Sequence, residues 1–413
     1  MFIKEVEAEL VKNSREESTI QVKVKTFKGV FICSAPSGKS KGKHEVQDYN
    51  PSGIRTSLKL TNIYLKEFKN KNIPLKEFND LVKIENSMKN FEKENGILGG
   101  NIFYAIEGAL LKAAAKERNV PLWKFISKKA KPSLPKLVGN AIGGGLHTRV
   151  KGKKPDFQEF LFLSKEGPVS KAVTKNILAY YDAKMRIRIR ERKFKIDTND
   201  ENAIICSLTN QEILELMRDV AKRYKLEIGL DIAASSFYDE KKKFYDYKNK
   251  RFYRTADEQV EYVANLISEY GIKYVEDPFE EEDFISFKNL RALLKEIGVD
   301  SLIVGDDLTV TNLARLRRAF RVEAINAIIV KPNQIGSLVE VSKVMEFCKQ
   351  NNITTIFSHR SGETLDNILA DYAVGFGADY IKTGIMGRER LIKLRRLIDI
   401  EEDSTLDQGS VKF

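Results

Sequence analysis

The feature that most restricts the fold of this chain is a series of six short apolar, β-rich runs in its second half, each ending in a polar or charged residue. A helical pattern follows each run, and the run ends lie 23 to 45 residues apart, about one strand–helix unit. In a parallel (β/α) barrel the carboxyl ends of the strands meet at one mouth, where the active site lies. We therefore expect an α/β barrel with these residues at its mouth: Asp231, Glu276, Asp306, Lys331, His359 and Lys382.

The first 130 residues have a different pattern. "TIQVKVKTFKGVFICSA" alternates apolar and polar residues as antiparallel strands do, with a turn near Lys28 and Gly29. "GNIFYAIEGALLKAAAKERNVPLWKFI" has helical periodicity, broken near Pro121. The stretch 128–136, rich in lysine and proline, is the best linker candidate. We expect a smaller α+β N-terminal capping domain over 1–130 and a (β/α)8-like barrel domain over 131–413.

Composition limits the class of protein. The chain has 413 residues, of which 42% are hydrophobic and 31% charged, which are values of a globular protein. Its first residues form no secretory signal, and no apolar run approaches the roughly 18 residues of a membrane span. The three cysteines lack metal-type spacing, which favours reduced thiols. We expect a cytoplasmic protein without a membrane partner.

The net charge of +12 leaves several partners open. The densest basic stretch, "AKMRIRIRERKFK" at 183–195, fits a helix end or a half-buried strand with one solvated face. No recognised nucleic-acid motif and no platform of interleaved aromatic residues accompanies that charge. Nucleic acid is therefore the less favoured partner, with the basic surface as the route by which it would bind.

The residues at the run ends suggest a specific chemistry. Asp231, Glu276 and Asp306 form a set of oxygen ligands suited to Mg2+. A lysine beside a divalent ion and a second ammonium has a lowered pKa and can take a proton from a weakly acidic C–H, a role open to Lys331 or Lys382. The alternatives are that the acids are ordinary surface groups, or that the two lysines neutralise them through salt bridges.

Two further stretches could bind anions. Arg360 and Ser361 follow His359, and a guanidinium pairs with phosphate through two parallel bonds. "APSGKSKGK" at 35–43 suggests a phosphate loop, but a Walker A motif needs glycine where Cys33 stands. A solvated basic loop and a phosphate-binding loop of another kind both remain open for this stretch.

Several longer blocks resemble the enolase family. They are "LGGN" (98–101), "QEF" (158–160), "EDPFEEEDF" (276–284), "GDDLTVTN" (305–312), "VKPNQIGSL" (330–338), "SHRSGETLDN" (358–367) and "IKTG" (381–384). "APSGKSKG" occupies the place of that family's mobile metal-binding loop, and "NSREEST" at 13–19 is similar to an early segment of the family. The resemblance extends over essentially the whole chain.

This resemblance implies a lyase of glycolysis and gluconeogenesis that dehydrates 2-phospho-D-glycerate reversibly to phosphoenolpyruvate with two Mg2+ per site. It implies a homodimer or a homo-octamer acting on a small phospho acid. Lys331 would be the base and Glu201 the general acid, with Glu159 and His147 beside it. The remaining roles implied are Asp231, Glu276, Asp306 and Ser40 for metal, and His147, Glu159, His359, Arg360, Ser361 and Lys382 for substrate.

The chain departs from the family pattern in two places. Where the family has Gly-Asp-Glu-Gly-Gly, this chain has Asn199-Asp200-Glu201-Asn202-Ala203, and Lys39 and Lys41 flank Ser40 in the loop. Loss of three glycines predicts an altered backbone path, because glycine supplies positive φ or close approach, although asparagine tolerates the left-handed region. The alternative is therefore an enolase-like paralogue, either weakly active on a related 2-phospho acid or a non-catalytic binder of RNA or another anion.

Overall fold

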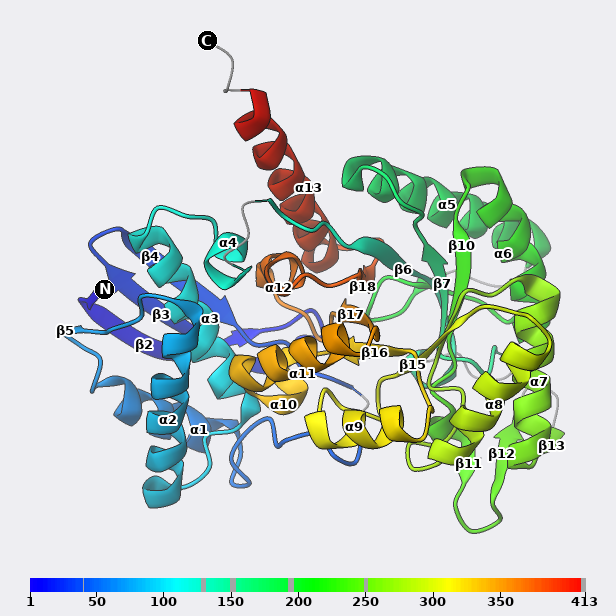
Figure 1. Cartoon of the computed structure of the whole chain (residues 1–413), viewed down its shortest axis with the longest axis horizontal. Coiled ribbons are helices and arrows are strands. Elements are labelled where there is room, and N and C mark those ends of the chain that lie inside the picture. The colour runs from blue at the N-terminus through cyan, green and yellow to red at the C-terminus, as the bar shows by residue number, and fades with distance from the viewer. Residues whose placement is uncertain (40, 128–130, 149–153, 192–196, 249–251, 410–413) are drawn as a thin grey trace.

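The computed structural model describes residues 1–39, 41–127, 131–148, 154–191, 197–248 and 252–409. An N-terminal part, drawn in blue and cyan in Figure 1, lies against one side of a strand barrel surrounded by helices. Among the described residues no helix is both long and apolar enough to cross a membrane. The basic stretch at 183–195 includes the end of a helix, Val169–Arg190, which is one of the two structures that the sequence predicts for it. Its residues 192–195 lie outside the described part.

The N-terminal part combines a three-stranded antiparallel sheet with helices. Strand β3 alternates buried and half-buried residues, because one face packs on helix α3 and the other faces outward. The turn at residues 27–28 and the helix break at Pro121 lie where the sequence predicts them. Its elements are β1 (Phe2–Ile3), β2 (Glu5–Lys12), β3 (Ser18–Thr26), β4 (Gly29–Ser34), α1 (Ile54–Leu65), β5 (Lys71–Asn72), η1 (Phe78–Asp80), α2 (Leu81–Asn95), α3 (Gly100–Glu117) and α4 (Leu122–Ser127).

The barrel part alternates strands and helices for most of its length. Helices α6 and α7 begin at capping boxes, Thr209 with Glu212 and Thr255 with Glu258, which satisfy the first free backbone N–H groups. The elements are β6 (Lys136–Gly143), η2 (Gly145–His147), β7 (Glu159–Leu163), α5 (Val169–Arg190), β8 (Asp197–Thr198), β9 (Ile204–Ile205), α6 (Asn210–Tyr224), β10 (Glu227–Asp231), η3 (Ala234–Phe237), β11 (Tyr238–Asp239), β12 (Phe244–Tyr247), β13 (Phe252–Arg254), α7 (Ala256–Tyr270), β14 (Tyr274–Glu276), α8 (Phe284–Glu296), β15 (Leu302–Gly305), α9 (Leu313–Arg321), β16 (Ala327–Val330), α10 (Pro332–Ile335), α11 (Leu338–Gln350), β17 (Thr354–Ser358), α12 (Ile368–Phe376), β18 (Tyr380–Gly384) and α13 (Arg388–Gly409).

The barrel is closed but not fully parallel. Its strand order is β18-β17-β16-β15-β14-β10-β7-β6, and β18 pairs with β6 to close the ring. Strand β7 runs antiparallel to both β6 and β10, so the predicted (β/α)8-like barrel is confirmed but departs from a fully parallel arrangement at this strand. Because β7 is reversed, its first residue, Glu159, lies opposite Asp231 at the mouth.

The inside of the barrel determines which side chains reach the mouth. Buried residues of six strands form a separate apolar cluster: Val138, Leu161, Leu163, Tyr274, Val304, Ala327, Ile329 and Ile356. Side chains alternate across a strand, so the inward side chain after Ile329 is that of Lys331, and the one after Val304 is that of Asp306. The candidate groups are therefore the next inward layer above a packed apolar core.

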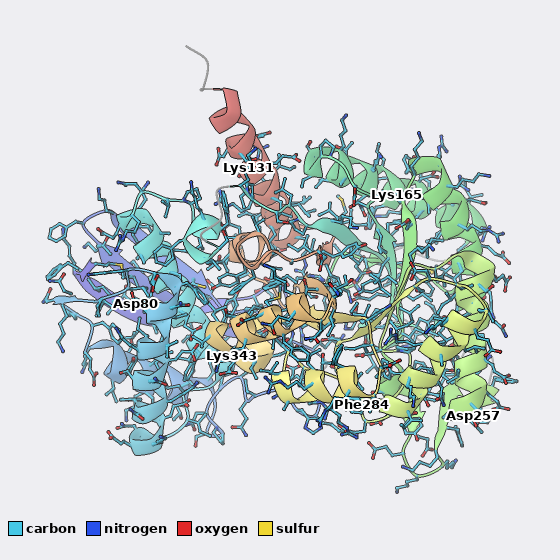
Figure 2. All side chains as sticks on the ribbon, viewed as in Figure 1. Asp80, Lys131, Lys165, Asp257, Phe284 and Lys343 are labelled. Atoms are coloured by element: carbon cyan, nitrogen blue, oxygen red, sulfur yellow. The ribbon has the colours of Figure 1, made fainter. Side chains whose placement is uncertain are left out.

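Side chains fill the space enclosed by the strands, while Lys165, Asp257 and Lys343 lie on the outer surface (Figure 2). The last helix, α13, extends beyond the barrel (Figure 1). The three cysteines are buried and free of disulfides. The division into domains at residues 130 and 131 remains a prediction, and part of the expected linker, 128–130, lies outside the described residues.

Candidate active site

The predicted residues meet in one enclosed cavity at the barrel mouth. Its free volume is about 40 Å³, room for only a few water molecules, so a phospho acid can bind only if side chains move. Glu276 is fully buried beneath it, and Ser40 lies outside the described residues. Ten predicted residues line the cavity: His147, Glu159, Glu201, Asp231, Asp306, Lys331, His359, Arg360, Ser361 and Lys382.

Lys382 lies at the centre of the cavity floor. Its Nζ is 2.8 Å from Asp231 Oδ2, 2.7 Å from Glu276 Oε2 and 3.1 Å from Glu159 Oε2. Burial alone would lower the pKa of Lys382, but these carboxylates outweigh burial and raise it well above its usual value. Lys382 is therefore a fixed positive charge that holds strands β10, β14 and β7 together at the mouth.

Lys331 forms an ion pair with Asp306 from the neighbouring strand. Burial and the nearby Arg360 lower the pKa of Lys331, yet Asp306 outweighs them and the pKa is raised. The predicted lowering of the pKa applies beside a divalent ion, whereas in the protein without ligands each lysine has a carboxylate partner. The salt bridges that were the alternative interpretation of the lysines are present.

The acidic residues nevertheless fit a divalent cation. Glu276 is buried and its Oε1 has no hydrogen-bond partner in the described part of the chain, so one carboxylate oxygen is left for another ligand. Two groups of donor atoms lie within 4.8 Å of one another: His147, Glu159 and Glu201, and Asp277, Asp306 and Asp307. Asp231, Glu276 and Asp306 are not such a group, since lysine ammoniums lie between their carboxylates.

Glu201 forms the opposite wall of the cavity. Asn140 Nδ2 donates to its Oε2 at 2.8 Å, and His147 Nδ1 lies 3.6 Å from its Oε1. Burial raises the pKa of Glu201, but the positive charges of His147 and Arg390 prevail and lower it. The same contact helps raise the pKa of His147 against the effect of burial. Without ligands the pKa of His147 therefore lies above that of Glu201, so His147 is the member of the pair that holds the proton more readily.

The segment around Glu201 is built without the three glycines. Asn199 Oδ1 accepts hydrogen bonds of 2.9 Å from the N–H groups of Glu201 and Ala203, which closes a tight turn. Asn202 has φ 61°, a conformation that asparagine tolerates, whereas Ala203 is not among the residues with positive φ. Position 203 therefore does not need a glycine, because no left-handed backbone is required there.

Two glycines elsewhere make room for the asparagine side chains. A Cβ at Gly143 would lie 2.4 Å from Asn199 Nδ2, and a Cβ at Gly387 would lie 2.2 Å from Asn202 Nδ2. The larger residues at 199 and 202 thus occupy space left by glycines on the neighbouring strand β6 and before helix α13.

The anion-binding stretch lies where β17 ends. His359 is buried with its Nε2 3.6 Å from Glu201 Oε2, and burial together with Arg390 lowers its pKa well below the usual value. Ser361 Oγ accepts from Arg15 Nη1 at 3.1 Å and from the Lys39 backbone N–H at 2.9 Å, so its own proton can be donated to a ligand. Arg360 makes a two-bond ion pair with Glu45, at 3.0 and 3.1 Å.

Gly38 and Lys39 line the cavity, and ion pairs hold Lys39 and the described residues 41–44 in place. Lys39 Nζ lies 3.7 Å from Asp200 Oδ2, Lys41 pairs with Asp48, and Lys43 pairs with Glu240 and Glu280 at 2.7 and 3.1 Å. His44 contacts Glu282 at 2.6 Å. The lysines that are unusual for the family each bind a different acidic partner, so they fix this loop in place.

Sequence reasoning missed several residues of the site. Asp277 and Asp307 directly follow predicted ligands, and their carboxylates lie on the same cavity. Arg15 belongs to the "NSREEST" segment, and Glu45 follows the loop by only a few residues. No local pattern shows that Arg390, in α13, donates to the backbone of Ser361 at 2.7 Å. That contact depends on how the last helix packs.

A closed strand barrel with acidic strand ends, two inward lysines and a buried His–Glu pair defines a barrel enzyme of acid–base chemistry. Family models match at residues 3–126, the enolase N-terminal domain, and at 131–409, the enolase C-terminal TIM barrel domain. The chain belongs to the enolase family.

Known relatives match along nearly the whole chain. The enolase of Methanosphaera stadtmanae is 36% identical over 410 residues, which cover 97% of each chain. The enolase of Methanothermobacter thermautotrophicus is 35% identical over 412 residues, again covering 97% of each. The enolase of Pyrobaculum aerophilum is 38% identical over 387 residues, covering 90% of this chain and 88% of that protein.

Proposed function

We propose that this chain catalyses the reversible dehydration of 2-phospho-D-glycerate to phosphoenolpyruvate. One observation carries the proposal: in a member of the enolase family, a lysine, an acidic wall and an Arg–Ser anion site converge on a single buried cavity. The reaction needs a base at C2, a proton donor for the C3 hydroxyl, and ligands for a carboxylate and a phosphate. The cavity holds a group suited to each task.

Two Mg2+ ions fit this proposal, with Asp231, Glu276 and Asp306 for the first and Ser40 for the second. When bound, they supply positive charge that offsets the second negative charge developing on the substrate carboxylate as the C2 proton leaves. The free Glu276 Oε1 supports such a cation. Lys382, already a cation among carboxylates, would bind the substrate carboxylate.

Lys331 would take the C2 proton. Its ion pair with Asp306 keeps it protonated in the ligand-free protein, so the ammonium must lose that partner before it can act as a base. Arg360 and Lys382 already place positive charge near Lys331, which disfavours its ammonium form once Asp306 is engaged elsewhere. Substrate binding and base activation are thereby coupled through Asp306.

Glu201 would deliver the proton to the departing hydroxyl. The neighbouring His147 holds a proton in the ligand-free protein, and Glu159 lies 3.4 Å from the same ring nitrogen. His147 can therefore return a proton to Glu201. The proposed base, Lys331, and the proposed acid, Glu201, would then act from opposite walls of the cavity. Phosphate would bind Arg360 and Ser361, and Arg360 would have to share or give up its bonds to Glu45.

The wider organisation also belongs to this proposal. The domain division at 130 and 131, and a homodimer or a homo-octamer, follow from family membership; light scattering of the purified protein distinguishes the two assemblies. Three buried free cysteines support a reducing, cytoplasmic compartment.

Purified protein incubated with Mg2+ and 2-phosphoglycerate should produce the ultraviolet absorbance of phosphoenolpyruvate. EDTA should abolish the signal, and Lys331→Ala should reduce it by about 10²–10⁴-fold, the usual contribution of a positioned base. Lys343→Ala, on the outer surface, is the matched control. Turnover indistinguishable from background in the parent protein would refute the proposal and favour a non-catalytic paralogue.

A further inference from the structure

A second surface, outside the catalytic cavity, has a distinct composition. Residues 241–254, "KKKFYDYKNKRFYR", carry seven Lys or Arg and one Asp, a net charge of +6 and so half of the charge of the chain. They include strands β12 and β13, which together with β11 form a small antiparallel sheet separate from the barrel. In Figure 1 this hairpin sheet, as we call β11–β13, extends from the edge of the barrel remote from the N-terminal part.

The inner face of the hairpin sheet attaches it to the barrel. Tyr245 and Tyr247 are buried, with the Tyr245 hydroxyl accepting from the Glu280 N–H and the Tyr247 hydroxyl donating to Gln259. The Arg254 guanidinium lies 3.7 Å from the ring centre of Tyr262. These contacts attach the hairpin sheet to the barrel through buried side chains.

The outer face is not used by the fold. Strand register places Tyr253 opposite Asp246, and Tyr253 packs on Phe244 with ring centres 4.5 Å apart. Tyr253 is 56% exposed, whereas its neighbour Phe252 lies opposite Tyr247 in the strand register and so belongs to the inner face. Apart from its contact with Phe244, the Tyr253 ring is left open to a partner.

Lysines border this aromatic face. Lys241, Lys242, Lys243 and Lys248 are exposed, and among the described residues none of the four has an ion-pair partner within 4.0 Å. Lys23, Lys25 and Lys43, by contrast, all pair with nearby glutamates. The positive charge beside the rings is thus left for an anionic ligand.

We propose that the outer face of the hairpin sheet binds single-stranded nucleic acid, with bases on the Phe244–Tyr253 rings and phosphates on the bordering lysines. Aromatic stacking combined with cations along a strand is how proteins bind single strands without reading sequence. Residues 237–254 contain no aliphatic side chain that would add apolar area to the rings, which makes insertion into a membrane surface the less favourable alternative. An acidic peptide would use the lysines but has no need of the rings.

Fluorescence anisotropy of the full chain with a labelled uridine oligomer of about 15 nucleotides tests this proposal. Tyr253→Ala should weaken binding by about tenfold, and Tyr253→Phe should retain it, because the ring face is what stacks. Changing Lys241, Lys242 and Lys243 together to Gln should lower the slope of log affinity against log salt by about two. All of these positions are exposed, so dehydration activity and melting temperature should not change.

The matched control removes the same charge elsewhere. Lys66, Lys69 and Lys71 are exposed lysines of the N-terminal part, and their combined change to Gln should leave binding unchanged. An equal loss in both lysine triples, or no loss in Tyr253→Ala, would overturn the proposal. So would polyglutamate competing as well as the RNA, since that result would assign the surface to an acidic protein.

Discussion

The floor and the rim of the active site are held by different forces. On the floor, Asp231, Glu276 and Lys382 belong to adjacent or facing barrel strands, directly above the apolar interior. On the rim, Lys39 and residues 41–44 are held mainly by ion pairs, and Glu201 lies in a turn between the short strands β8 and β9 that is closed by hydrogen bonds to Asn199. The backbone thus fixes the floor groups, while charge pairs fix the rim groups.

This difference predicts how each region responds to change. Buried ion pairs on the floor are weakly screened by salt, and removing one partner leaves an uncompensated buried charge. Rim pairs such as that of Lys43, whose side chain is 50% exposed, are each worth at most about 1 kcal/mol and weaken in salt.

The largest expected effect is on the floor. Lys382→Met should lower the free energy of unfolding by roughly 3–5 kcal/mol, because Asp231, Glu276 and Glu159 lose their shared cation. Urea unfolding measures the loss, and Mg2+ should recover part of it by replacing the ammonium. Equal stability of parent and variant would show that this floor charge is not needed.

A smaller effect is expected where the Glu201 segment meets helix α13. Gly387→Ala forces a Cβ to within 2.2 Å of Asn202 Nδ2 at a φ of 95°, so it should cost about 1–3 kcal/mol and displace Glu201. Adding Asn202→Gly removes the clash but leaves the backbone strain, and should restore part of the stability. If the double variant were no better than Gly387→Ala alone, the side-chain compensation would be disproved.

A still smaller effect is expected on the loop. Lys43→Gln should raise KM for 2-phosphoglycerate a few-fold, and added salt should reduce the difference from the parent protein, since both remove the contacts to Glu240 and Glu280. Lys28→Gln, at an exposed turn, is the control and should not change KM. A Lys43→Gln variant with unchanged kinetics at low salt would show that the loop closes without this pair.

The weakest effect concerns pH. The raised pKa of His147 stabilises the fold below its unfolded value near 6.5, and that contribution is lost as pH rises through the folded pKa. The lowered pKa of Glu201 stabilises above about 4.5 and is lost as pH falls through its folded value. His147→Asn should therefore cost more stability at mildly acid pH than at alkaline pH. A loss of stability that did not depend on pH would contradict the charge pair of His147 and Glu201.

The sequence predicts the floor better than the rim. Alternation along the strands and the spacing of strand–helix units are local, periodic properties of the chain, so they can be recognised in the sequence. Together they predict that Asp231, Asp306, Lys331 and Lys382 lie at one mouth of the barrel. The reversed direction of β7 could not be predicted in this way, because side chains alternate with the same period whichever way a strand runs. Glu159 was placed by resemblance rather than by period.

Charge states and rim contacts could not be predicted in this way. The pKa of Lys331 depends on Asp306, and that of Glu201 on His147 and Arg390, all of which are distant in sequence. The sequence is compatible with a turn containing asparagines 199 and 202. Only the packed structure shows that their side chains occupy the space beside Gly143 and Gly387.

The most direct test of the account is hydrogen exchange at C2 of 2-phosphoglycerate in heavy water with the Glu201→Gln variant. With Lys331 as the proposed base and Glu201 as the proposed acid, the variant should still exchange the C2 proton through Lys331 while phosphoenolpyruvate formation falls by about 10²–10⁴-fold. Loss of exchange together with dehydration would show that Glu201 is not a dedicated acid, and would contradict the separation of the two walls.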